Sequence, residues 1–149
     1  MPDSVNMELL EKEYFHLQSV VEDFDSKSLT IKAWSVTLGI GVAGSGAFTE
    51  NFILLSFASI AAFMFWLIDA YWKTFQYAYY LRIIHIENYL SGNAGEIMAP
   101  QICTSWSESY HQGGQTRLYK ILFWPHVVLP HGIMCIGFLI LYFSLAKLN

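Results

Sequence analysis

Hydrophobic residues run almost unbroken from position 34 to position 68, and the only stretch of consecutive polar residues in the run is Thr49, Glu50 and Asn51. A helix that crosses a bilayer needs about 20 mostly apolar residues, and about 17 is the lower limit. The run therefore holds enough apolar residues for two short spans. It predicts a membrane hairpin in which spans over residues 33–48 and 52–69 are joined by the polar turn.

The segment before the hairpin, residues 4–31, has apolar residues at alternating spacings of three and four, which predicts an amphipathic helix. These residues are Met7, Leu10, Tyr14, Leu17, Val21, Phe24 and Ile31, and Ser28 alone breaks the series. The other faces carry Glu8, Glu11, Glu13, Glu22, Asp23 and Asp25, which we expect to be solvated. The apolar seam either packs on the next soluble helix of the same chain or associates with a second subunit.

Helical periodicity continues beyond Asp69, with no Gly or Pro before Gly92. The stripe consists of Trp72, Phe75, Tyr79, Ile83, Ile86 and Leu90. We expect span two and this stripe to form one helix of about 38 residues, roughly 57 Å long at 1.5 Å per residue. Arg82 and Glu87 should keep its far end in water. Residues 4–31 and 70–90 would then form a cytoplasmic helical hairpin.

The rest of the chain divides into a polar and an apolar segment. Residues 91–116 are rich in Gly, Ser and other polar residues, and we expect a loop with room for a short helix around 97–106. The segment 121–149 is the third predicted transmembrane helix. Its two prolines predict a clean span only from Val127 or His131 onward. The predicted fold is thus an all-α membrane protein with three transmembrane helices, and residues 70–120 form a cytoplasmic helix and loop.

Composition agrees with a membrane location. The chain of 149 residues is 54% hydrophobic and 13% charged, against about 25% charged in soluble domains. The acidic start has no apolar region typical of a cleavable signal peptide. A net charge of −4 argues against a general nucleic-acid coat. Cys103 and Cys135 lie in different surroundings, so we expect free thiols.

Basic residues predict the orientation. Seven of the eight fall on one side of the predicted spans: Lys12, Lys27, Lys32, Lys73, Arg82, Arg117 and Lys120. Only Lys147 lies on the other side. By the positive-inside rule the N-terminus is cytoplasmic and the C-terminus is outside.

No hydrolytic or transfer motif is visible, and we expect a protein that is not an enzyme and that has no catalytic residues, metal or cofactor. His126 and His131 are about 140° apart around a helix, a poor geometry for sharing a metal. Each is interpreted as a hydrogen-bonded structural histidine. The alternative is proton sensing or gating, because histidine changes charge near neutral pH.

Pore or helix-packing residues are suggested in the hairpin. Gly39, Ala43 and Ala47 share one face of span one, where small side chains let helices approach closely. Glu50 and Asp69 stand at the two ends of span two. They either mark helix ends at interface depth, where water is available, or act in function. In a ring of subunits Glu50 would form an acidic mouth that favours cations.

A second candidate group surrounds the aromatic cytoplasmic helix: Lys73, Arg82, His85, Arg117 and Lys120. These side chains could hold an anionic ligand such as a nucleotide or nucleic acid, with a base stacked on Tyr or Trp. The alternative is contact with lipid headgroups together with pairing to the acidic N-terminal helix.

In its layout the chain resembles the SLATT-type small bacterial membrane effectors. The segments that carry the resemblance are ELLEKEYFHLQSVVEDFDSKSLTIKAWSVTLGIG (8–41) and FWLIDAYWKTFQYAYYLRIIHIE (65–87). The third span departs from a two-span plan. The resemblance implies an inner-membrane effector of anti-phage defence, held inactive until a nucleotide, a nucleic acid or a partner protein encoded alongside triggers it.

Two functional hypotheses follow. Three spans cannot enclose a water path alone, so a conducting function requires a homo-oligomer in the lipid bilayer, most economically a ring. The leading hypothesis is an ion-conducting or depolarising pore, in which the small-residue face of span one contacts a neighbour or lines the path. The alternative is a non-conducting membrane adaptor that recruits a cytoplasmic partner.

Overall fold

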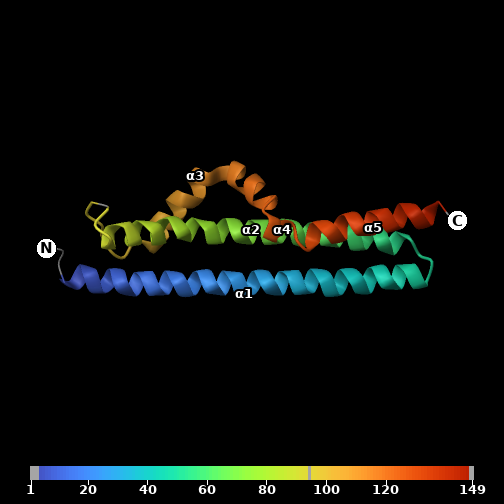
Figure 1. Ribbon diagram of the computed structural model, residues 1–149, viewed down its shortest axis with the longest axis horizontal. Coiled ribbons are helices and arrows are strands. Elements are labelled where there is room, and N and C mark those ends of the chain that lie inside the picture. Colours follow the sequence, from blue (N-terminus) through green and yellow to red (C-terminus); the bar gives the residue numbers. More distant parts are fainter. Residues whose placement is uncertain (1–3, 94, 148–149) are drawn as a thin grey trace.

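The computed structural model describes residues 4–93 and 95–147, which form five helices and no strand. The helices are α1 (Ser4–Phe48), α2 (Ile53–Leu90), α3 (Ile102–Leu122), α4 (Pro125–Val128) and α5 (His131–Ala146). The described chain is all-helical, as the periodicity predicts. α1 begins at one end of an elongated molecule, and α5 ends at the other (Figure 1).

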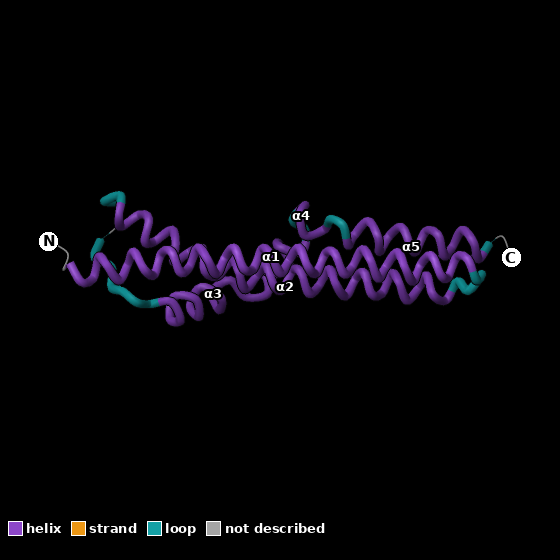
Figure 2. The backbone as a smooth tube through the Cα atoms, turned by 90° about the horizontal axis from the view of Figure 1, so that it is seen from below, coloured by secondary structure: helices purple, strands orange, loops and turns teal. Residues whose placement is uncertain are grey.

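The two long helices lie side by side and antiparallel along the whole molecule (Figures 1 and 2). The chain reverses after Phe48, where the Asn51 amide donates to the Gly46 carbonyl at 2.9 Å and Glu50 adopts a positive φ of 55°. The predicted polar turn is therefore confirmed. The single long second helix is also confirmed, because α2 runs for 38 residues without a break. α1 is equally continuous over 45 residues, so the amphipathic segment and span one are one helix.

The first part of α1 packs on the last part of α2 through the predicted seam. Leu10, Leu17 and Val21 are buried against Ile83 and Ile86. This confirms the interpretation in which the seam packs within its own chain. Because the seam is buried there, self-association between subunits would have to use another face.

The predicted loop over residues 91–116 is wrong for most of its length. α3 occupies 21 residues and has a kink at Gly114, where φ is 50° and ψ is −158°. Trp106 and Tyr110 stack at 5.1 Å, both lie against Phe75 of α2, and the Trp106 indole donates to the Phe75 carbonyl at 3.1 Å. These aromatic contacts stabilise a helix that has a polar sequence. Figure 1 shows α3 arching away from α2 and returning to it at α4.

The last helix begins at His131, one of the two predicted starting points, because Pro130 ends the preceding short turn. α5 packs between the ends of α1 and α2 through a small cluster of Ala43, Leu55, Ala58 and Phe138. We refer to residues 33–48, 53–69 and 131–146 together as the apolar half. The remainder of α1 and α2, together with α3, is the polar half.

The apolar half exposes large hydrophobic side chains from all three of its helices. They include Leu38, Ile40, Phe48, Ile53, Phe57, Ile60, Ile133, Ile136, Ile140 and Phe143. Among the described helices, α2 alone is long and apolar enough to cross a membrane by length and composition; α5 is apolar but has only 16 residues. The fold is thus all-α with one candidate spanning helix, and the three-span arrangement stays a prediction.

Candidate functional site

A buried polar cluster lies where the apolar half meets the polar half. Its centre is Asp69 of α2, which has no exposed surface. The Ser28 hydroxyl donates to Asp69 Oδ1 at 2.6 Å, and the Lys32 ammonium donates to Oδ2 at 2.5 Å. Lys32 also donates to Ser28 Oγ at 2.7 Å. Two residues of α1 thus satisfy both carboxylate oxygens of one residue of α2.

α5 contributes His131 to the cluster, and this side chain is also fully buried. Its Nδ1 lies 2.8 Å from the hydroxyl oxygen of Ser35, which confirms a hydrogen-bonded histidine. Its Nε2 has no hydrogen-bond partner in the described part of the chain and lies 3.6 Å from Asp69 Oδ2. That distance is too long for a hydrogen bond. A small movement of α5 toward α2 would bring the imidazole into contact with the carboxylate.

The local sequence explains how these groups meet. Ser28, Lys32 and Ser35 are spaced by four and three residues, so they lie on one face of α1. Ser28 interrupts the apolar seam at the level where Asp69 ends the apolar run of α2. His131 reaches the same level because α5 begins there. The expectation that water is available to Asp69 is wrong, because protein atoms enclose its carboxylate.

The cluster is built around one ion pair. Lys32 and Asp69 form an ion pair whose side chains are 18% and 0% exposed. Removing one partner of such a pair leaves an uncompensated charge in a poorly hydrated place, which typically costs about 3–5 kcal/mol. The cluster therefore joins three helices around one buried ion pair.

A second ion pair lies in the polar half and corrects two predictions. The sequence predicts that Glu13 and Arg82 are in water, yet their side chains are 1% and 2% exposed. The guanidinium binds both carboxylate oxygens, at 2.8 and 2.9 Å, and also donates to the Met98 carbonyl at 2.8 Å. The Gln101 amide donates to Glu13 at 3.2 Å. This pair fastens the segment before α3 onto α1 and α2.

Of the five basic candidates, Lys73 and Arg82 pair with the acidic face of α1. Lys73 donates to Asp25 and to the side chain of Gln76. Partial burial alone would raise the pKa of Asp25, but hydrogen bonds from Lys73 and Gln76 and the Lys73 charge outweigh it and hold this pKa below its usual range. For these two residues the interpretation as partners of the N-terminal helix is confirmed.

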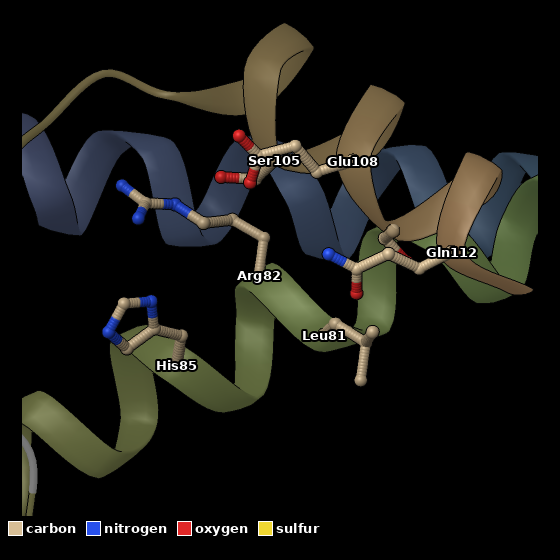
Figure 3. A pocket seen from close by; sticks show the side chains of 7 residues that line it. Leu81, Arg82, His85, Ser105, Glu108 and Gln112 are labelled. Atoms are coloured by element: carbon tan, nitrogen blue, oxygen red, sulfur yellow. The ribbon is translucent and has the colours of Figure 1, made fainter.

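Arg82 and His85 also line a shallow pocket of about 180 Å³ between α2 and α3 (Figure 3). Both project from α2, while Ser105, Glu108 and Gln112 project from α3 on the other side. Arg82 is already neutralised by Glu13, and Glu108 adds a negative charge to the pocket. This electrostatic balance does not favour a phosphate group. Arg117 and Lys120 lie elsewhere, in a groove between α2 and the end of α3.

The predicted pore or packing residues of the apolar half separate into two groups. Gly39 and Ala43 are buried within the chain, and a Cβ at Gly39 would approach the Met134 side chain to 2.5 Å. Ala47 and Glu50 are exposed near the turn. Two of the three small residues therefore pack against α5 and α2 of their own chain, so only Ala47 remains free to contact a neighbour.

Several of the residues that build the site are missing from the predicted candidates: Ser28, Lys32 and Ser35. Their common spacing on α1 opposite Asp69 is the signal that could have found them. Among the described residues, no three His, Cys, Asp or Glu side chains are grouped so that they could hold a metal ion. No family model, no curated protein and no solved structure matches this chain.

Proposed function

We propose that the chain is a multi-pass protein of the bacterial inner membrane, with the apolar half embedded as three spans. The exposed hydrophobic side chains on all three helices support this proposal, because in lipid they need no further cover. The spans are α1 from residue 33, the start of α2 and α5. Gly39 lets α5 approach α1 closely, and close approach of backbones favours helix association in lipid.

The proposed activity is regulated ion conduction by a homo-oligomer. One chain offers three tightly packed helices, so a water-filled path requires several copies around an axis. Glu50 lies exposed near the turn, where copies in a ring would present carboxylates at the outer mouth and favour cations. The polar half would lie in the cytoplasm, in keeping with the distribution of basic residues.

The observation that carries the proposal is the buried cluster of Asp69, Lys32 and His131. It joins all three membrane helices at the level where α1 and α2 leave the apolar half. Both helices continue unbroken into the polar half, so a ligand or partner bound there can move them as rigid rods. We propose that the cluster holds the helices in a closed arrangement and yields when the polar half moves.

The resemblance to SLATT-type effectors suggests anti-phage defence as the biological setting and a nucleotide, a nucleic acid or a partner protein as the trigger. The pairing of Arg82 with Glu13 favours a protein trigger over a phosphate-bearing ligand at the pocket in Figure 3. Depolarisation of an infected cell would be the outcome of opening.

Ion flux from sealed vesicles tests the activity. Purified protein is reconstituted into vesicles that contain a potassium-sensitive dye, and flux is compared for the wild type, Lys32→Met and the matched variant Lys73→Met. We expect Lys32→Met to leak more than the wild type, because it breaks the buried cluster, and Lys73→Met to behave as the wild type. Vesicles that stay tight for all three proteins would contradict the proposal.

The natural cysteines test the orientation. Cys103 is exposed on α3, whereas Cys135 lies on α5 inside the apolar half. A membrane-impermeant maleimide added to inside-out membrane vesicles should label Cys103 readily and Cys135 hardly at all. Labelling of Cys103 from the outside of intact cells would overturn the proposed orientation.

The second candidate function is a non-conducting adaptor. Leu9 and Phe15 are 38% and 62% exposed on α1 in the polar half, where lipid does not cover them. Such side chains are suited to contact a partner protein. A protein that captures a cytoplasmic partner through these residues but never conducts would be this adaptor.

A further inference from the structure

A groove between α2 and the α3–α4 segment is left open on the surface of the polar half. It consists of two adjoining cavities of about 340 and 390 Å³, which share Tyr77, Leu81 and Trp124. Arg117 and Lys120 of α3 line the first cavity, and Lys73, Tyr80 and His126 line the second. Cationic and aromatic side chains therefore dominate its walls.

The charge in this groove is not compensated. None of the residues lining either cavity is acidic, in contrast to the pocket that contains Glu108. Lys73 is neutralised by Asp25 behind it. Arg117 lies with its guanidinium 5.0 Å from the centre of the Tyr77 ring and donates to the Ser109 carbonyl at 2.8 Å. Within the described chain neither Arg117 nor Lys120 has an ion-pair partner, so two positive charges remain free.

The groove lies at the depth of lipid headgroups when the apolar half is embedded. A hydrocarbon core about 30 Å thick covers about 20 residues of helix, from Ile53 to about Trp72. Tyr77 then lies about 7.5 Å further along α2, at the outer edge of a headgroup region roughly 5–7 Å thick. Trp124 lines both cavities and offers an apolar surface next to the free charges.

We infer that this groove binds the headgroup of an anionic phospholipid from the cytoplasmic leaflet. The phosphate lies between Arg117 and Lys120, the hydroxyl of Tyr80 is available to the polar part of the headgroup, and the acyl chains pass over Trp124 toward the apolar half. This inference rests on the proposed membrane embedding and extends it with a specific lipid. Free phosphate shares the charge but lacks the acyl chains.

Binding of soluble short-chain lipids to the full-length protein in neutral detergent tests the inference. Native mass spectrometry would measure the apparent Kd for dioctanoyl phosphatidylglycerol, for dioctanoyl phosphatidylcholine and for inorganic phosphate. Each basic side chain near an anionic lipid contributes about fivefold in affinity, so Arg117→Gln with Lys120→Gln should weaken phosphatidylglycerol binding about 30-fold. The matched control, Lys12→Gln with Lys27→Gln, removes the same charge outside the groove and should leave binding unchanged.

The charge-preserving pair Arg117→Lys with Lys120→Arg should retain phosphatidylglycerol binding, which separates loss of charge from loss of folding. Equal binding of the two lipids would overturn the inference, and so would an equal loss in the control pair. If inorganic phosphate binds as tightly as phosphatidylglycerol, the groove recognises phosphate alone, and its assignment to a lipid is overturned. If reconstituted vesicles conduct ions but the protein binds both lipids equally, this inference alone is refuted. If the protein prefers phosphatidylglycerol but the vesicles do not conduct, only the proposed activity is refuted.

Discussion

Replacing Lys32 by Met removes the cationic hydrogen-bond partner of Asp69, whose side chain is fully buried. The carboxylate then keeps its bond from Ser28 but has no fixed positive charge nearby. Breaking a buried ion pair from one side costs about 3–5 kcal/mol. We expect a value near 5 kcal/mol, at the upper end, because water does not reach Asp69.

The reverse substitution should cost less. Asp69→Ala leaves Lys32, which is 18% exposed and can extend its ammonium toward water, so the expected cost is about 3 kcal/mol. The double variant should be less damaging than the sum of the single ones, with a coupling of about 1–3 kcal/mol. This order, with Lys32→Met worse than Asp69→Ala, follows from the unequal burial of the two partners.

The free energy of unfolding would be measured in detergent by titration with sodium dodecyl sulfate, followed by ellipticity at 222 nm. Lys73→Met is the matched control, because it breaks a pair between the same two helices whose acidic partner is 53% exposed. Such a pair contributes about 0–1 kcal/mol. If Lys32→Met destabilises the protein no more than Lys73→Met, the reasoning about the buried cluster is refuted.

Three further predictions concern the rest of the molecule. Glu13→Ala should cost about 3–5 kcal/mol, because it strands the buried Arg82, and proteolysis between α2 and α3 should increase; an unchanged cleavage rate would contradict this. The folded-state pKa of Asp25 is lowered. Its contribution to stability is therefore present above the unfolded pKa of about 3.9 and is lost as the pH falls through the folded pKa. Asp25→Asn should flatten the dependence of the unfolding free energy on pH below about pH 4. Gly39→Leu should overpack the contact with α5 and cost about 1–3 kcal/mol, whereas Gly41→Leu, which meets open space, should be nearly neutral in the same titration.

The long helices and their turn follow from the sequence, because hydrophobic periodicity and a short polar break are local signals. α2 contains no Gly or Pro over its 38 residues, and its predicted length is the observed one. The seam of α1 is local as well, although its partner is not. Which helix buries Leu10 and Leu17 depends on the tertiary fold, so the sequence alone does not distinguish packing within the chain from packing between subunits.

The errors concern residues whose state is decided by distant contacts. The polar composition of 91–116 predicts a loop, but stacking of Trp106 on Tyr110 and the contact of Trp106 with Phe75 stabilise a helix there. On its own helix, each of Glu13 and Arg82 looks like a solvated charge. Both can be buried because they form an ion pair with each other, although they are 69 residues apart in the sequence. Periodicity on one helix carries no information about such a pair.

For the same reason, only part of the candidate site can be predicted from the sequence. Asp69 is conspicuous as a charge that ends an apolar run, and His131 as a histidine after a proline. Ser28 looks like a defect in the apolar seam until Asp69 is placed opposite it. The sequence shows the small-residue face of span one, but it does not show that α5 of the same chain packs against Gly39 on that face.

Current across a planar bilayer tests the central claim most directly, because it asks whether the protein conducts and whether the buried cluster controls the path. Purified wild-type protein, Lys32→Met and Lys73→Met would be compared at equal protein density. The account predicts rare openings for the wild type and for Lys73→Met, and frequent discrete openings for Lys32→Met. Silent bilayers for all three proteins, or equal activity of the two lysine variants, would contradict it.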